Sequence, residues 1–150
     1  TWVIDPIDGT YNFVKGSPLV GVNIALIIDD IPEVGVTHLP FLKETYTSKK
    51  GDGVAFNDVP LGKFTKNSHH LTVSVEGGRD NNRILGAASV ELAWFARGIF
   101  TRVEYKKVAP WDVAPGILFT SEQGGVIQSS HGSIYWDDIT FSRKDQQEIE

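Results

Sequence analysis

Residues 2–14 read Trp2-Val-Ile-Asp-Pro-Ile-Asp-Gly-Thr-Tyr-Asn-Phe-Val14. Residues 2–4 read as the end of a buried strand, which leads directly into an acidic turn. The proline and glycine of this turn can direct the carboxylates of Asp5 and Asp8 and the carbonyl of Ile7 toward one place. Such oxygen ligands are the ones that Mg²⁺ prefers in proteins. The backbone N–H groups of Gly9 and Thr10 follow at a possible helix start, where they could bind a phosphate oxygen, and the Thr10 hydroxyl could orient a water. The alternative for the five residues from Asp5 to Gly9 is an ordinary surface turn.

The pattern after this turn predicts an antiparallel meander. Residues 19–28 form a nearly continuous apolar stretch, Asp29-Asp30 reads as a turn, and residues 34–39 read as the next strand. Residues 45–48 alternate as a further strand, and residues 54–61 read as a short hairpin around Asn57-Asp58.

The second half of the chain mixes helices and strands. Residues 86–97 predict a helix with Gly98 at its C-terminal end. The run from Trp111 to Gln123, which Pro110 precedes, predicts a second helix closed by Gly124-Gly125. Glu91 on the first helix is expected to face solvent or to be structural. Short strands are expected at residues 71–75, 103–105 and 126–128; the pattern weakens beyond His131, and residues 143–150 read as a polar tail.

Composition narrows the class of protein. The 150 residues carry a formal net charge of −5, which disfavours nucleic acid as the main partner. No apolar run approaches the length of a membrane span, so a cytoplasmic protein is expected. The chain has no cysteine, so a metal ion must be held by oxygen or imidazole. His69-His70 is a weak metal candidate, because neighbouring residues of a strand point to opposite faces.

A second motif supplies a third acid. The run Trp111-Asp-Val-Ala-Pro-Gly-Ile-Leu-Phe-Thr-Ser-Glu-Gln-Gly-Gly125 places Asp112 in the first turn of the second helix. A lone acidic residue there usually complements the helix dipole, at about 0.3–1 kcal/mol. A cation site at Asp5 and Asp8, however, requires a further carboxylate, and Asp112 can provide it.

Together the two motifs resemble those of the inositol monophosphatase family. The first is similar to its Trp-x-x-Asp-Pro-x-Asp-Gly-Thr-x-Asn-Phe signature and the second to its Trp-Asp-x-Ala-x-Gly segment ending in Glu-x-Gly-Gly. The segments Lys50-Gly-Asp-Gly-Val-Ala-Phe-Asn57 and Gly86-Ala-Ala-Ser-Val-Glu-Leu-Ala93 lie between them in the family's order. The resemblance covers about residues 1–128 and implies an α/β (α+β) sandwich of alternating layers, with an antiparallel meander sheet and a second, smaller sheet.

The resemblance also implies a lithium-sensitive hydrolase of phosphate monoesters that uses Mg²⁺, or Mn²⁺ as a substitute. Asp5 would bridge two metal ions, the Ile7 carbonyl would bind the first, and Asp8 and Asp112 would bind the second. Asp5 and Thr10 would be catalytic. The residues expected to bind phosphate or substrate are Gly9, Thr10, Gly86, Ala87, Ala88, Glu104 and Asp112.

Several features depart from the family pattern. The chain opens in mid-strand at Thr1, which we interpret as a single partial domain over residues 1–150 that lacks the N-terminal helices and an upstream glutamate; low activity of the isolated chain is expected. The link at residues 76–85 is short for a parallel crossover. Tyr105 stands where the family has its substrate-contacting glutamate, which leaves Glu104 as a weak candidate. Pro115 lacks an N–H, so mild helix distortion is expected.

Three functions therefore stay open. The first is hydrolysis of inositol monophosphate or a related sugar phosphate. The second is hydrolysis of a 3′(2′),5′-bisphosphate nucleotide by the same chemistry. The third is a non-catalytic remnant that binds a metal ion or a partner protein. The expected partner is a small phosphorylated substrate, with no membrane or nucleic acid, and the family resemblance makes a homodimer possible.

Overall fold

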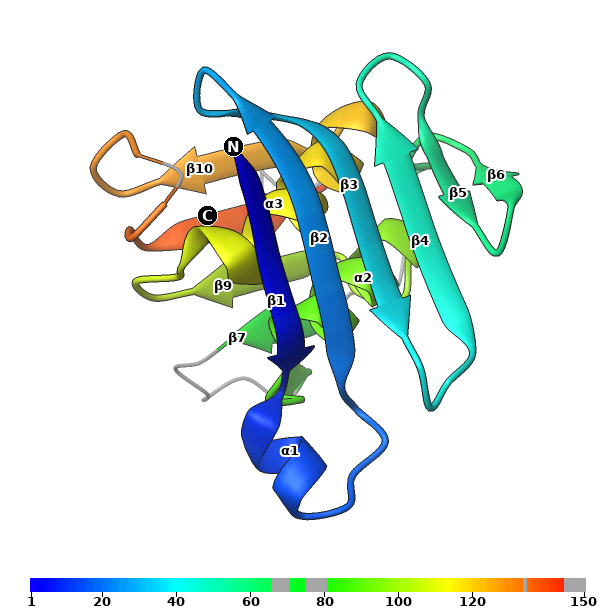
Figure 1. The fold of residues 1–150 in the computed structure, drawn as a ribbon. Coiled ribbons are helices and arrows are strands. Elements are labelled where there is room, and N and C mark those ends of the chain that lie inside the picture. The colour runs from blue at the N-terminus through cyan, green and yellow to red at the C-terminus, as the bar shows by residue number, and fades with distance from the viewer. Residues whose placement is uncertain (66–70, 75–80, 134, 145–150) are drawn as a thin grey trace.

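The computed structural model describes residues 1–65, 71–74, 81–133 and 135–144, which form two sheets with helices between them (Figure 1). The elements are β1 (Trp2–Asp8), α1 (Thr10–Val14), β2 (Gly21–Ile28), β3 (Ile31–Leu39), β4 (Glu44–Lys49), β5 (Val54–Phe56), β6 (Val59–Leu61), β7 (Thr72–Ser74), β8 (Asn82–Arg83), α2 (Ala88–Arg97), β9 (Arg102–Tyr105), α3 (Pro110–Glu122), β10 (Val126–Ser129) and β11 (Ile139–Ser142).

The first sheet is the predicted meander. Its six strands lie in sequence order from β1 to β6, and each pairs with the next in antiparallel fashion. Two-residue turns join β2 to β3 at Asp29-Asp30 and β5 to β6 at Asn57-Asp58. All four turn residues have positive φ, between 45° and 66°, as tight hairpin turns require. Asp and Asn tolerate this conformation, which is why the two turns could be recognised in the sequence.

The second sheet has the order β10-β11-β9-β7-β8. Strand β7 pairs in parallel with β8 and β9, whereas β11 pairs in antiparallel fashion with β9 and β10. Strands β8 and β11 were not predicted. The four residues of β11 give only two apolar positions, Ile139 and Phe141, and both are buried. Part of the link at residues 76–85 lies outside the described residues; its end, β8, lies parallel to β7.

Helices α2 and α3 form the layer between the sheets (Figure 1). On one side α2 packs with β3 and β4 around a core that includes Tyr46 and Phe119; on the other, both helices pack on the second sheet around Phe95, Val103 and Phe141. Helix α2 ends at Gly98 with φ 88°, as predicted. In the part of the chain that the structure describes, no helix is long and apolar enough to cross a membrane.

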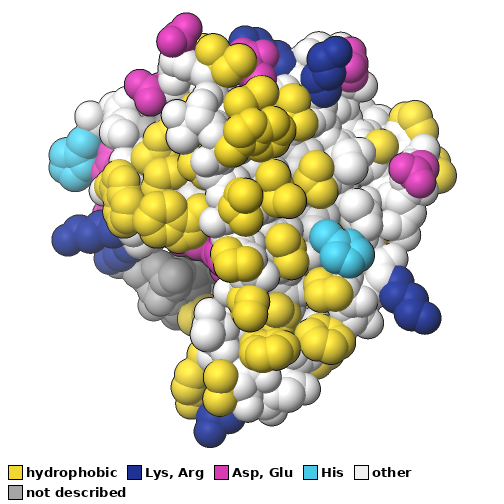
Figure 2. Space-filling view, in the orientation of Figure 1, with side chains coloured by type: hydrophobic (Ala, Val, Ile, Leu, Met, Phe, Trp, Pro, Cys, Tyr) yellow, Lys and Arg dark blue, Asp and Glu magenta, His cyan; other side chains and the backbone are white. Residues whose placement is uncertain are grey.

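The outer face of the first sheet is apolar. Figure 2 shows hydrophobic side chains gathered over it, and Trp2, Ile4 and Ile28 are exposed there. Among the described residues no helix covers this face. The interpretation of residues 2–4 as a buried strand is therefore wrong for two of them, because β1 is an edge strand of this sheet and only Val3 points inward, toward Ala25 and Ile27.

Gly21 allows α2 to approach the first sheet closely. A Cβ atom at this position would lie 2.2 Å from Ser89 Oγ and 2.6 Å from Ser89 Cβ. Because Ser89 belongs to the first turn of α2, the helix would have to move. We expect Gly21→Ala to lower the free energy of unfolding by about 1–3 kcal/mol, the usual cost of overpacking. Urea unfolding measures this, and Gly62→Ala is the control, since a Cβ there meets nothing within 4 Å.

Candidate metal and phosphate site

Three carboxylates from the two sequence motifs converge in the structure. Asp5 and Asp8 lie on β1 and Asp112 lies in the first turn of α3. One ligand oxygen from each residue lies within 4.8 Å of the other two. These are hard oxygen donors, so the donor set fits Mg²⁺ or Mn²⁺.

A bulge in β1 brings the two acids of the first motif together. Asp5 pairs with Asn23 of β2 and Asp8 pairs with Gly21, so two residues that are three positions apart on β1 face partners that are only two positions apart on β2. The extra residue bends the strand and changes the direction of its side chains. Asp5 Oδ1 also accepts a hydrogen bond of 3.1 Å from the Ile7 N–H. The acidic segment is thus the bulged end of a strand rather than a turn that follows it.

Asn23 holds the third acid in place. Its buried side chain donates to the carbonyl of Trp111 at 3.3 Å and to that of Asp112 at 3.1 Å, and its Oδ1 accepts from Thr37 Oγ1 at 2.7 Å. In an α-helix the Trp111 carbonyl would accept from residue 115, but Pro115 has no N–H. Asn23 therefore replaces the donor that the helix lacks and ties the start of α3 to β2.

The residues after Asp8 form a helix start, as the sequence predicts. Gly9 has φ 82° and α1 begins at Thr10. The first N–H groups of a helix lack acceptors within the helix, and that of Gly9 interacts with the carboxylate of Asp8. Thr10 Oγ1 donates a hydrogen bond of 3.0 Å to the Ile7 carbonyl, which fixes these two groups relative to each other.

The segment Gly86-Ala87-Ala88 lies beside this helix start. A Cβ on Gly9 would lie 2.9 Å from the Ala87 Cβ, which shows how closely the two segments approach. Asn12 Nδ2 joins them further by donating to the carbonyls of Leu85 at 2.8 Å and Leu19 at 2.9 Å. Helix α2 begins at Ala88, two residues later than the predicted start.

Strand β9 places Glu104 and Tyr105 on opposite faces. Glu104 lies in an ion pair with Arg102, with Oε1 2.6 Å from Nε. Tyr105 is 8% exposed and its hydroxyl donates to Glu91 Oε2 at 2.7 Å. The structure therefore brings Tyr105, rather than Glu104, toward the acidic cluster. Glu91 is 3% exposed, so the solvent-facing alternative for it is wrong and the structural one stands.

Two acids of the cluster, Asp112 and Asp8, have raised pKa values, because they are partly buried and lie close to other carboxylates. Burial, followed by the charge of Asp8 and by contact with Asp5, raises the pKa of Asp112 to about 6. Burial also raises the pKa of Asp8, although the Ser89 N–H at 2.6 Å from Asp8 Oδ2 opposes this. Negative charges held this close favour a proton or a cation between them.

The raised pKa of Asp112 predicts a pH dependence of stability. The folded chain keeps this proton up to about pH 6, whereas the unfolded chain loses it near the ordinary value of 3.8. The contribution of Asp112 to folding stability is therefore lost as the pH rises through this range. In EDTA, the free energy of unfolding of the unchanged chain should therefore fall relative to that of Asp112→Asn when the pH is raised from 4 to 7. Urea unfolding at both pH values measures it, and an identical pH slope for both proteins would contradict it.

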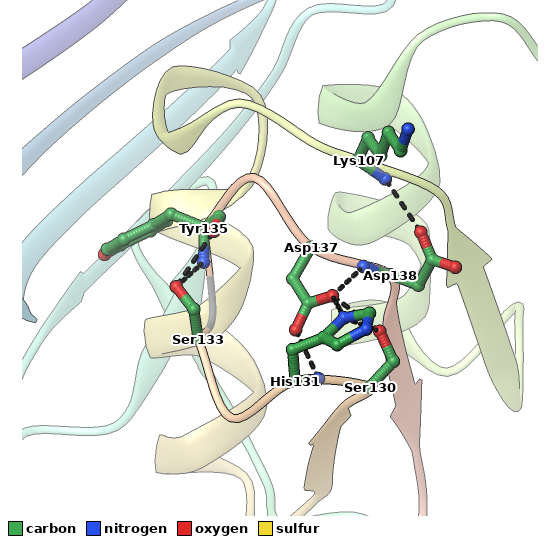
Figure 3. A network of polar contacts seen from close by, with 7 residues as sticks. All are labelled: Lys107, Ser130, His131, Ser133, Tyr135, Asp137 and Asp138. Carbon is green, nitrogen blue, oxygen red and sulfur yellow. Dashed lines mark hydrogen bonds and ion pairs between the residues drawn. The ribbon is translucent and has the colours of Figure 1, made fainter.

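A second polar network lies in the loop between β10 and β11 (Figure 3). Asp137 accepts hydrogen bonds from Ser130 Oγ and from the N–H groups of His131 and Asp138, and its Oδ1 lies 2.7 Å from His131 Nδ1. The pKa of His131 is raised by this contact, and that of Asp137 is lowered. The Ser130 hydroxyl also lies 2.9 Å from His131 Nδ1, so the serine, the histidine and the aspartate are all in contact, and together they join the two ends of the loop.

Sequence reasoning missed Asn23 and the part played by Glu91. Both are polar residues inside otherwise apolar runs, and buried polar groups require partners, so this signal could have identified them. The His69-His70 pair lies outside the described residues.

Comparisons with known proteins agree with the two motifs. The sequence profile of the inositol monophosphatase family matches residues 1–148. The chain is 36% identical to inositol monophosphatase 1 of Solanum lycopersicum, over 95% of this chain and 60% of that protein. It is 30% identical to fructose-1,6-bisphosphatase/inositol-1-monophosphatase of Thermotoga maritima, over 87% of this chain and 57% of that protein.

A solved structure gives the same result for the fold. The inositol monophosphatase of Anabaena (Nostoc) sp. PCC 7120 superposes with a TM-score of 0.82 and 27% identity, over 95% of this chain and 69% of that one. The chain spans about 60% of the length of the curated relatives that it matches.

Proposed function

The chain belongs to the inositol monophosphatase family, and from this premise we propose that it supplies the metal- and phosphate-binding part of a Mg²⁺-dependent phosphatase. The substrate is a small phosphate monoester, with inositol monophosphate or a related sugar phosphate first. The observation that carries the proposal is the convergence of Asp5, Asp8 and Asp112, with ligand oxygens within 4.8 Å of one another. A cytoplasmic location and a homodimer belong to the same proposal.

Each residue of the site has a proposed role in binding the cations, the phosphate or the attacking water. Asp5 and the Ile7 carbonyl would hold one cation, and Asp5, Asp8 and Asp112 would hold a second. When bound, the cations would neutralise the phosphate and lower the pKa of an attacking water. The N–H groups of Gly9 and Thr10 would bind phosphate oxygens at the start of α1. The Thr10 hydroxyl donates to the Ile7 carbonyl, so its oxygen can accept a hydrogen bond from a water and orient it.

The alcohol part of the substrate would lie near Gly86, Ala87 and Ala88. Their segment approaches Gly9 closely, which supports a contact on this side of the phosphate. The ion pair with Arg102 gives no support to Glu104 as a contact for a substrate hydroxyl.

Phosphate release tests the proposal. We would compare inositol 1-phosphate, fructose 1,6-bisphosphate and adenosine 3′,5′-bisphosphate as substrates, each with Mg²⁺ and with EDTA. We expect low turnover from the 150-residue chain, dependent on Mg²⁺ and fastest with inositol 1-phosphate. If phosphate is released fastest from adenosine 3′,5′-bisphosphate, the alternative function, hydrolysis of a bisphosphate nucleotide, would be favoured instead. Binding of Mn²⁺ without release from any substrate would favour a non-catalytic metal-binding protein.

A further inference from the structure

The structure holds a second buried carboxylate close to the acidic cluster, that of Glu91 in the first turn of α2. Both of its oxygens are used: Oε1 accepts from the Leu85 N–H at 2.8 Å and Oε2 accepts from the Tyr105 hydroxyl at 2.7 Å. Glu91 is 3% exposed. A carboxylate is costly to bury, so its two partners must be well placed to keep it there. Glu91 therefore joins the segment before α2 to strand β9.

Leu85 is fixed from two sides. Its N–H binds Glu91, and its carbonyl accepts a hydrogen bond of 2.8 Å from Asn12 Nδ2 on α1. Gly86 then turns the chain with φ 78°. These contacts set the position of Ala87, which packs against Gly9, and hence the place where α2 begins.

The beginning of α2 in turn holds Asp8. The N-cap residue of α2 is Ala87, which has no side chain to accept the first N–H groups of the helix. Asp8 Oδ2 accepts the Ser89 N–H instead, at 2.6 Å. The rotamer of Asp8, and so its place in the cluster, therefore depends on where the first turn of α2 lies.

We propose that Glu91 is a positioning residue for the acidic site: by holding Leu85 and Tyr105 it fixes the first turn of α2, so that the Ser89 N–H keeps Asp8 beside Asp5 and Asp112. It does so without contacting the substrate or the cation. The consequence for metal binding rests on the function proposed above, whereas the positioning itself does not.

Two measurements on the 150-residue chain test it: hydrogen exchange of the Leu85 and Ser89 amides by NMR without metal, and Mn²⁺ affinity by calorimetry. We expect Glu91→Ala to speed exchange of both amides at least about 10-fold, because the local opening becomes easier. We expect the same variant to weaken Mn²⁺ binding by about 10–100-fold, the usual cost of losing a group that orients a ligand. Glu91→Gln keeps an oxygen for the Leu85 N–H, and its own N–H can donate to the Tyr105 oxygen once that hydroxyl turns, so it should stay within about 3-fold of the unchanged chain in both measurements.

Glu122→Ala is the matched control. Glu122 also accepts two hydrogen bonds, from the N–H groups of Gly51 and Gly53, but it lies at the opposite end of α3 from Asp112. Glu122→Ala should leave the exchange rates of the Leu85 and Ser89 amides and the Mn²⁺ affinity unchanged. If Glu91→Ala behaves like this control, the positioning role is overturned. If Glu91→Gln is as damaging as Glu91→Ala, the charge of Glu91 matters rather than its contacts, and the proposal is equally overturned.

The two proposals can fail separately. An unchanged chain that binds no Mn²⁺ overturns the metal site, while amide exchange still decides the role of Glu91. If Glu91→Ala does not fold, Tyr105→Phe replaces it, because it keeps the ring and removes only the hydroxyl. Faster exchange of the Leu85 amide in that variant supports the proposal, and unchanged exchange contradicts it.

Discussion

Asp5→Asn is expected to abolish divalent cation binding while making the metal-free protein slightly more stable. In the proposed site Asp5 is a ligand of both cations, so its loss removes a ligand from each. Changing a group that merely orients a ligand costs about 10–100-fold in affinity, so loss of the ligand itself should exceed about 100-fold. Titration calorimetry with Mn²⁺ measures this loss directly, and any Mg²⁺-dependent phosphate release should fall with it.

The gain in stability separates loss of the site from damage to the fold. Three carboxylates with oxygens within 4.8 Å repel one another, and asparagine removes one of the charges. Its Oδ1 can still accept the hydrogen bond that Asp5 receives from the Ile7 N–H. We therefore expect a higher melting temperature than that of the unchanged chain in EDTA, and no further rise on addition of Mn²⁺.

Asp52→Asn is the control for this experiment. Asp52 is exposed and forms an ion pair with Lys49 at the surface, so its substitution should alter neither cation binding nor the response to Mn²⁺. Cation binding by Asp5→Asn as tight as that of the control would remove the basis for the metal site.

Local chemistry explains which parts of the fold could be predicted from the sequence. The meander was predictable because Asp29-Asp30 and Asn57-Asp58 tolerate the positive φ that tight hairpins need. The two long helices were predictable from their apolar content and from glycines at their ends. The convergence of Asp5, Asp8 and Asp112 was predictable because they lie in two extended motifs, and a cation site at the first motif needs the carboxylate of the second.

The remainder depends on contacts between distant residues. The pairing of Asp5 with Asn23 is a matter of strand register, and the bulge that turns Asp8 inward leaves no local signature. The same limit applies to Glu104. The family's spacing from Asp112 falls on Tyr105, and Glu104 was a weak candidate because it stands next to that position; the pleat of β9 places Glu104 beside Arg102, on the face opposite Tyr105. β11 was missed because a strand of four residues is too short to show alternation clearly.

Among the substitutions proposed here around the acidic cluster, Asn23→Ala is expected to lower the free energy of unfolding the most. It leaves the carbonyl of Trp111 without the donor that compensates for Pro115, and it leaves the hydroxyl of Thr37 without its acceptor. Each buried polar group without a partner costs about 1–3 kcal/mol, so the free energy of unfolding should fall by about 4 kcal/mol. Urea unfolding measures the loss.

The dependence on Pro115 makes the role of Asn23 testable as a coupling. Pro115→Ala restores an N–H that can donate to the Trp111 carbonyl from within α3, so this carbonyl no longer depends on Asn23. Asn23→Ala should therefore cost at least about 1 kcal/mol less in the Pro115→Ala background than in the unchanged chain, as a double-mutant cycle would measure. Additive costs would mean that Asn23 does not replace the missing helix donor. In that case Asn23 would tie β2 to the start of α3 through the carbonyl of Asp112 rather than through that of Trp111. Coupled costs would mean that one amide side chain both completes α3 and sets the distance from Asp112 to Asp5, so that stability and cation affinity fall together.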